Sequence, residues 1–84
     1  MTNKVLVKLF VPLIEEEFEV WVPINKKIGE VIRLLCKSIS ELTGGEYLPD
    51  KTPSLYDKAT GKQIDVNLNV KEASIKNSSE LIIL

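Results

Sequence analysis

The sequence has 84 residues, 44% of them hydrophobic and 27% charged, and its formal net charge is −1. This size allows one domain with one core, and the near-neutral charge excludes a general attraction to nucleic acid or acidic lipid. The single cysteine excludes an internal disulfide, which secreted domains of this size usually need, and no apolar run approaches the ~20 residues that span a bilayer. We therefore expect one cytoplasmic domain over residues 1–84, without direct insertion into a membrane.

Two alternating segments near the N-terminus predict a β-hairpin. Lys4–Val11 and Glu17–Val22 place apolar side chains at every second position, which is the period of a strand. Pro12–Glu16 is the turn candidate between them. Matching the apolar faces fixes the register. The expected cross-strand pairs are Val5 with Val22, Leu6 with Trp21, Val7 with Val20, Lys8 with Glu19 and Leu9 with Phe18.

The next segment predicts one amphipathic helix. Its apolar residues recur with the period of an α-helix, and Gly44-Gly45 is expected to end it. Asn25 is the best N-terminal cap by residue type. Leu34 lies about 120° from the apolar stripe, and we expect the loop Glu46–Pro53 to cover it, with a secondary contact as the alternative. The stripe consists of Ile28, Val31, Ile32, Leu35, Ile39 and Leu42.

The C-terminal half predicts three more strands. These are Ser54–Tyr56, Lys62–Asp65 and Glu80–Leu84, and the segment before the last strand is irregular, with one helical turn near Val70–Ala73. The helix must cross the sheet to bury its stripe, and the last strand then pairs most economically in parallel with the first. The expected fold class is α+β: a β-grasp, with a mixed sheet packed on one helix and the order β-β-α-β-β-β.

The order and spacing of these elements resemble ubiquitin. Val5-Leu-Val-Lys8 is similar to its opening strand, and the helix repeats its apolar spacing. There are two departures: Ala73 occupies the position of a tyrosine that pins a loop in ubiquitin, and no di-glycine tail follows Leu84. The resemblance implies a ubiquitin-like fold that is not conjugated to other molecules. Further matches lie at Ile28, Val31, Leu35, Gly61-Lys-Gln-Ile64, Val70, Ile75, Ser79 and Leu81.

Among ubiquitin-like proteins, the chain is most similar to the YukD/EsaB family of bacterial type VII secretion. The similarity rests on its length, on Val22-Pro23 before the apolar helix, and on Leu81–Leu84 as the final strand. It implies a cytosolic accessory or regulatory component that works by protein contact. One alternative is a β-grasp accessory subunit of a multicomponent enzyme, such as a diiron monooxygenase. Another is a sulfur carrier or conjugated modifier, which would need residues beyond Leu84.

No set of residues in the sequence indicates catalysis. Histidine is absent, which removes the commonest general base and metal ligand, so Cys36 has no histidine to activate it. A half-buried packing role is expected for this thiol. Glu15-Glu16-Glu17 is interpreted as a solvated hairpin tip, with a cation site as the alternative. We expect no enzyme activity, no cofactor, no metal and no nucleic-acid binding.

One open face of the sheet is the candidate functional site. If alternate strand residues point at the helix, their neighbours point to solvent. These neighbours include large apolar and aromatic side chains, the types that anchor interfaces. We expect this face to bind a protein partner, and a homodimer through the same face is a second option. The alternatives are a tolerated apolar patch and a slipped register that turns Trp21 inward. The predicted partner-binding residues are Leu6, Phe10, Trp21, Tyr56, Ile82 and Leu84.

Overall fold

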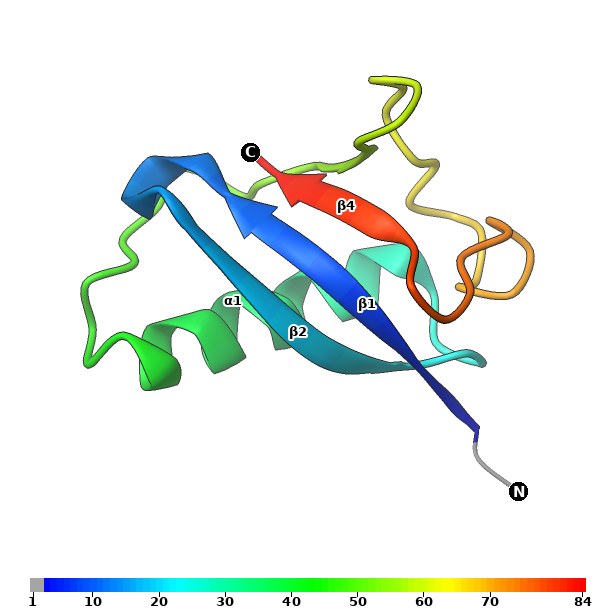
Figure 1. Ribbon diagram of the computed structural model, residues 1–84, viewed down its shortest axis with the longest axis horizontal. Helices are drawn as coiled ribbons and strands as arrows, with labels where there is room; N and C mark the ends of the chain where they lie inside the picture. Colours follow the sequence, from blue (N-terminus) through cyan, green and yellow to red (C-terminus); the bar gives the residue numbers. More distant parts are fainter. Residues whose placement is uncertain (1–2) are drawn as a thin grey trace.

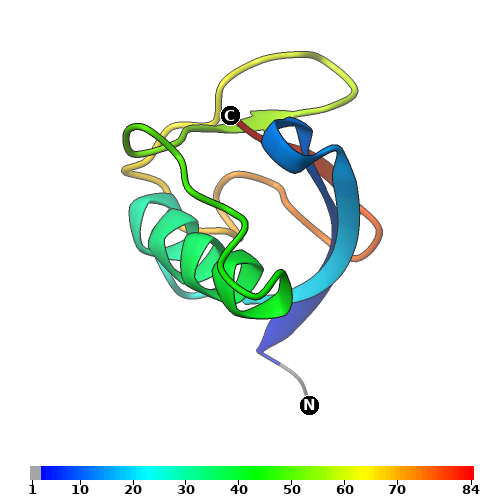
Figure 2. The same cartoon turned by 90° about the vertical axis from the view of Figure 1, so that its left-hand side faces the viewer.

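The computed structural model describes residues 3–84, which form one mixed sheet and one helix (Figure 1). The sheet has four strands in the order β2-β1-β4-β3. Figure 2 shows α1 on one side of the sheet, which gives the two layers of the predicted α+β fold. The elements are β1 (Lys4–Val11), the 3₁₀ turn η1 (Pro12–Ile14), β2 (Glu16–Pro23), α1 (Ile28–Leu42), β3 (Leu55–Asp57) and β4 (Glu80–Ile83).

β1 and β2 form the predicted hairpin. Every predicted cross-strand pair is present, including Leu6 beside Trp21. The connection is a tight turn in which Pro12 begins η1 and Glu15 adopts a left-handed conformation with φ 52°. The Glu15 N–H donates to the Pro12 carbonyl oxygen at 3.1 Å. β2 therefore starts at Glu16, one residue before the predicted position.

The C-terminal strand pairs as predicted, but one expected strand is missing. β4 is parallel to β1 and antiparallel to β3. The strand predicted over Lys62–Asp65 does not form, and Gln63 makes only a single bridge to Tyr56. The reason is local: the Asp57 carboxylate and the Thr60 hydroxyl accept backbone N–H groups two residues further on, at 3.0 and 3.2 Å. Such side-chain bonds favour turns over ladders, so the observed order is β-β-α-β-β.

The N-terminus of α1 is capped by tertiary contacts. Lys27 is the N-cap residue and no side chain caps the helix, so the prediction of Asn25 is wrong. The N–H groups of the first two helical residues donate instead to the carbonyl oxygens of Leu68, at 2.8 Å, and Val66, at 3.2 Å. A helix leaves its first N–H groups without partners inside the helix. Here the backbone of a distant loop satisfies them, and no local signal in the sequence announces it.

The core lies between α1 and the sheet. Two expectations fail at its margin. Leu42 is 64% exposed, because the last turn of α1 runs beyond the sheet (Figure 1). The loop Glu46–Pro53 leaves Leu34 47% exposed and instead inserts Tyr47, which is buried, into the core. The buried hydrophobic residues are Val7, Leu9, Val11, Val22, Ile28, Val31, Ile32, Leu35, Ile39, Tyr47, Leu55, Val70, Ile75, Leu81 and Ile83.

Gly44 and Gly45 end α1 as predicted, in left-handed conformations with φ of 65° and 89°. Replacing Gly45 with alanine is expected to lower the free energy of unfolding by about 1 kcal/mol, because a Cβ disfavours this φ. Gly29→Ala is the matched control. Gly29 lies in α1, and its added Cβ would be 3.7 Å from the carbonyl oxygen of Val66 in the neighbouring loop, which is an ordinary van der Waals distance. We therefore expect this variant to raise the free energy of unfolding by about 0.5–1 kcal/mol. Urea unfolding measures both changes, and equal losses would contradict the proposed cap.

Candidate protein-interaction surface

The sheet face opposite α1 carries the six predicted binding residues. Strand alternation and the observed register place five of them on this side, which is nearer the viewer than α1 in Figure 1. Leu84 follows β4, and its backbone pairing with Ser54 continues the same alternation. Trp21 is 58% exposed and Leu84 is 63% exposed, whereas the other four side chains are half-buried. Trp21 therefore does not point into the core, and the slipped-register alternative is wrong.

The register arranges five of these six side chains in two groups. Phe10 on β1 lies beside Ile82 on β4, and Ile82 lies beside Tyr56 on β3, which makes an apolar row across three strands. Leu6 and Trp21 form a separate pair toward the N-terminal end of β1. Aromatic and aliphatic side chains at such positions are within contact distance of one another. Each group therefore offers a small apolar contact area of its own.

A charged row divides the two apolar groups. Lys8 on β1 lies beside Glu19 on β2 and Glu80 on β4, and all three side chains are exposed. The six apolar residues, expected to form one patch, are therefore divided by charged side chains. A partner for this face must combine two apolar contacts with polar groups between them.

The Lys58 side chain partly covers the apolar row. Its Nζ atom lies 5.8 Å from the centroid of the Phe10 ring and 3.8 Å from the Glu17 carboxylate. The first contact is a cation–π interaction and the second an ion pair. The two charged side chains are 41% and 51% exposed, and exposed pairs of this kind contribute little to stability. A partner can therefore displace the lysine at a small energetic cost.

Leu84 also borders a groove at the hairpin tip, which was not among the expected surfaces. The groove has a volume of about 390 Å³, and its apolar lining includes Pro12, Leu13 and Tyr47. Leu13 is 60% exposed and Leu48, in the neighbouring loop, is 75% exposed. An apolar residue directly after Pro12, inside a turn, is the sequence signal that could have indicated this second exposed surface.

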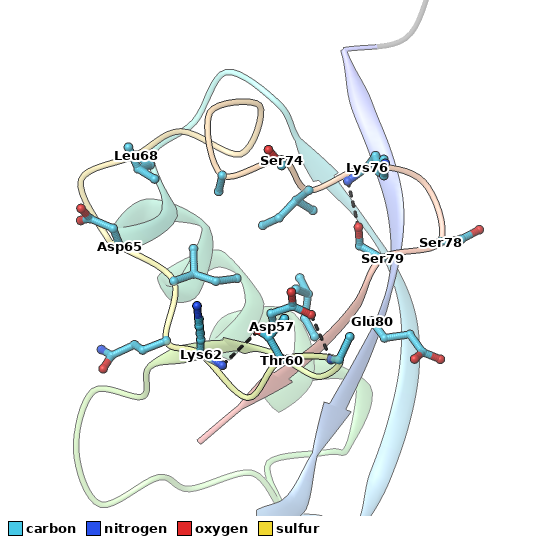
Figure 3. Close-up of a pocket in the computed structure, with 16 residues that line it drawn as sticks. Asp57, Thr60, Lys62, Asp65, Leu68, Ser74, Lys76, Ser78, Ser79 and Glu80 are labelled. Atoms are coloured by element: carbon cyan, nitrogen blue, oxygen red, sulfur yellow. Dashed lines mark hydrogen bonds between the residues drawn. The ribbon is translucent and has the colours of Figure 1, made fainter.

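A larger hollow of about 720 Å³ lies between residues 57–65 and residues 68–81 (Figure 3). Ile64, Ala73 and Ile75 contribute to its apolar lining, and Lys62 and Lys76 are among its polar residues. Asp57, Asp65 and Glu80 also line it, so neither charge dominates. Within residues 3–84, no group of three or more His, Cys, Asp or Glu side chains could hold a metal ion.

Ala73 accounts for part of this hollow, because its small side chain is half-buried at the wall. The surrounding turn is held by a reciprocal pair of hydrogen bonds instead of a large side chain. The Asn69 N–H donates to the Glu72 carboxylate at 2.9 Å, and the Glu72 N–H donates to the Asn69 side-chain oxygen at 2.7 Å. This is a capping box, and it forms at the helical turn predicted near Val70–Ala73.

Replacing Ala73 with phenylalanine is expected to raise the free energy of unfolding by about 1 kcal/mol, because the ring fills existing space and buries apolar surface. Ala73→Ser is the control, since it changes the same position without filling the hollow. Thermal unfolding followed by circular dichroism compares the two variants. A loss of stability in the phenylalanine variant would show that the hollow closes in solution.

Cys36 on α1 and Tyr47 in the loop after the helix form a partly buried contact. The sulfur lies 3.9 Å from the tyrosine hydroxyl oxygen. Burial raises the pKa of the Cys36 thiol, and burial together with the neighbouring thiol raises the pKa of the Tyr47 hydroxyl. A raised pKa lowers the thiolate fraction and so the reactivity of the cysteine. The structure therefore places Cys36 as a half-buried packing residue.

The raised pKa of Tyr47 predicts a loss of stability at alkaline pH. In the unfolded chain the hydroxyl ionises near pH ~10, whereas in the folded protein it keeps its proton to higher pH. The folded state then binds more protons, so the free energy of unfolding falls as the pH rises past about 10. We expect Tyr47→Phe to reduce this slope, with Tyr56→Phe as the control for the loss of a half-buried hydroxyl. Urea unfolding at several pH values around 10 measures this pH dependence. If Tyr47→Phe leaves the slope of unfolding free energy against pH unchanged, the Tyr47 hydroxyl is not its cause.

No protein-family model matches the sequence, and no curated protein matches it significantly. Solved structures do match. The EccD5 ubiquitin-like domain from Mycobacterium xenopi superposes with a TM-score of 0.81 at 17% identity, over 99% of this chain and 94% of that chain. The fold is ubiquitin-like. The ubiquitin-like domain of the Mycobacterium tuberculosis type VII secretion protein EccD1 superposes with a TM-score of 0.77 at 10% identity, over 99% of both chains.

Two further matches among solved structures agree with this fold. A protein designed from ubiquitin superposes with a TM-score of 0.68 at 17% identity, over 100% of this chain and 90% of that chain. A chain of the MycP5-free ESX-5 inner membrane complex matches with a TM-score of 0.80 at 16% identity, over 99% of this chain but only 21% of that chain. At these low identities, the matches show the ubiquitin-like fold alone and not a shared role. Within residues 3–84, no helix has the length and apolar character needed to cross a membrane.

Proposed function

We propose that this chain is a ubiquitin-like protein-interaction module that serves a type VII secretion system, as a cytosolic accessory or regulatory component of the YukD/EsaB kind. The observation that carries the proposal is the structural match over almost the whole chain to ubiquitin-like domains of secretion proteins. A fold alone does not determine function, so the second support is the site: a sheet face with exposed apolar groups beside a charged row.

The proposed partner surface is this sheet face. Trp21, which is 58% exposed, is its main anchor, because tryptophan is among the residues that contribute most to protein interfaces. The row of Phe10, Ile82 and Tyr56 supplies a second contact. The charged row between them orients the partner, since charge complementarity fixes register more than affinity.

We also propose that the protein acts by non-covalent contact and is not conjugated to other proteins. Both backbone groups of Leu84 pair with Ser54: the Leu84 N–H donates at 3.0 Å and its carbonyl oxygen accepts at 2.8 Å. This residue therefore contributes to the sheet. The intact mass of the native protein, with a search for conjugates of higher mass, tests the proposal. A covalent adduct at the C-terminus would contradict it.

The experiment that tests the secretion role is a deletion of the gene in its native cell, followed by quantification of secreted substrates. We expect secretion through the type VII system to fall and to be restored by the wild-type chain. Secretion through the general pathway is the control and should not change. Unchanged type VII secretion would contradict the role, and so would co-purification of the tagged protein with an unrelated complex only.

A further inference from the structure

β2 is an outer strand of the sheet, and the direction of its hydrogen bonds can be assigned. The Ile24 N–H donates to the Asn3 carbonyl oxygen at 2.8 Å, and the Lys8 N–H donates to the Ser79 carbonyl oxygen at 2.9 Å. Successive residues of a strand direct their backbone groups to opposite edges. The even-numbered residues of β1 therefore face β4 and the odd-numbered ones face β2. The odd-numbered residues of β1 lie opposite even-numbered residues of β2. The even-numbered residues of β2 therefore direct their backbone groups toward β1.

The odd-numbered residues of β2 leave their backbone groups at an open edge. Glu17, Glu19 and Trp21 direct N–H and C=O outward, and within residues 3–84 these groups bond to no other segment. β3, the other outer strand, has backbone bonds to residues 62–64. The edge of β2 is also regular, because its register with β1 contains no bulge. Such an edge is a template for an added strand.

A groove runs beside this edge, between β2 and α1. Its volume is about 240 Å³, and its lining includes Val20, Leu34, Leu35 and Ser38. Leu34 is 47% exposed on the helix side. In a strand added to β2, alternate side chains would point to the helix side and lie over this groove. Apolar side chains suit these positions.

The charges beside the edge indicate which residues of an added strand suit the positions on the other side of the sheet. Glu17 and Glu19 are exposed on the opposite side of β2, and opposite charges on neighbouring strands are favourable. Within the described residues, Glu19 has no ion pair, whereas Glu17 is 3.8 Å from Lys58. A second copy of the chain fits poorly, because antiparallel pairing centred on Glu19 would place two glutamates directly opposite each other.

We propose that the open edge of β2 binds an extended segment of a partner protein, in which apolar residues alternate with lysine or arginine. The apolar residues lie over the groove beside Leu34, and the basic residues lie opposite Glu17 and Glu19. The backbone groups of Glu19 and Trp21 continue the sheet into the segment. The site goes beyond the proposed secretion role. It shares Glu19 and Trp21 with the proposed partner surface but adds the open strand edge, whereas Phe10 and Ile82 belong to the sheet face alone.

The test uses nuclear magnetic resonance of the ¹⁵N-labelled full chain with short alternating peptides, one of valine and lysine and one of valine and glutamate. With the lysine peptide, we expect the amides of Glu17, Glu19 and Trp21 to shift and to exchange more slowly with solvent. The glutamate peptide should bind at least about tenfold more weakly. Equal binding of both peptides, or shifts confined to Phe10 and Ile82, would overturn the proposal.

Two variants sharpen the result. Glu19→Pro removes an outward N–H that the sheet does not use, which an edge strand tolerates, and should abolish binding of the lysine peptide. The double variant Glu17→Lys, Glu19→Lys changes exposed side chains only, and should reverse the preference between the peptides. If Glu19→Pro fails to fold, the double variant alone tests the proposed site. An unreversed preference, or dimerisation through β2 in size-exclusion chromatography with light scattering, would contradict the proposal.

Discussion

Replacing Leu9 with alanine is expected to lower the free energy of unfolding by about 3 kcal/mol. Leu9 lies on β1 between Phe18 of β2 and Leu81 of β4, and its side chain is completely buried. The truncated side chain would leave a cavity at the centre of the sheet, where strands on both sides limit relaxation. Urea unfolding with an intrinsic fluorescence signal from Trp21 measures the change.

Lys8→Ala is the matched control for this substitution. Lys8 is the neighbour of Leu9 on the same strand but is exposed on the opposite side of the sheet. Its replacement should change the free energy of unfolding by no more than about 0.5 kcal/mol. If the two variants lose similar stability, the assignment of inward and outward residues on β1 is wrong, and the proposed surface is wrong with it.

The second large effect concerns binding. Replacing Trp21 with aspartate should reduce recovery of the protein partner at least about tenfold, because a buried tryptophan anchor contributes 2 kcal/mol or more to an interface. Stability should change by less than about 1 kcal/mol, since the side chain is 58% exposed in the free protein. Quantitative mass spectrometry of complexes purified from the native cell measures the recovery.

Leu42→Asp provides the control for the binding measurement. Leu42 is 64% exposed, close to the exposure of Trp21, but it lies at the end of α1 and outside the proposed surface. We expect this variant to recover the partner as well as the wild type does. Equal losses in both variants would mean that a general change in solubility, and not a specific contact, controls recovery.

The sequence alone predicted the sheet and the helix because each has one strongly buried face. The alternation of Val5, Val7 and Leu9 has a period of two, and a slip by one residue would expose every one of these side chains. The register with β2 was therefore predictable. The helix was predictable for the same reason, from a stripe with period 3.6.

The remaining differences depend on contacts between distant segments. Asn25 was a reasonable local cap, but the carbonyl groups of Val66 and Leu68 take that role. Tyr47 reaches the core from a loop, which no periodic pattern indicates. In the site, sequence alternation placed the six apolar residues on one face. It did not show that Lys58 covers Phe10, because that contact joins segments far apart in the chain.

The most direct test of the account is photo-crosslinking in the native cell from the middle of the open sheet face. Lys8, exposed between the two apolar groups, is replaced with benzoylphenylalanine, and Lys37, exposed on α1, is replaced in the control. We predict that the residue at position 8 crosslinks to a component of the secretion machinery and that the residue at position 37 does not. A crosslink from position 37 with none from position 8 would contradict the assignment of this face.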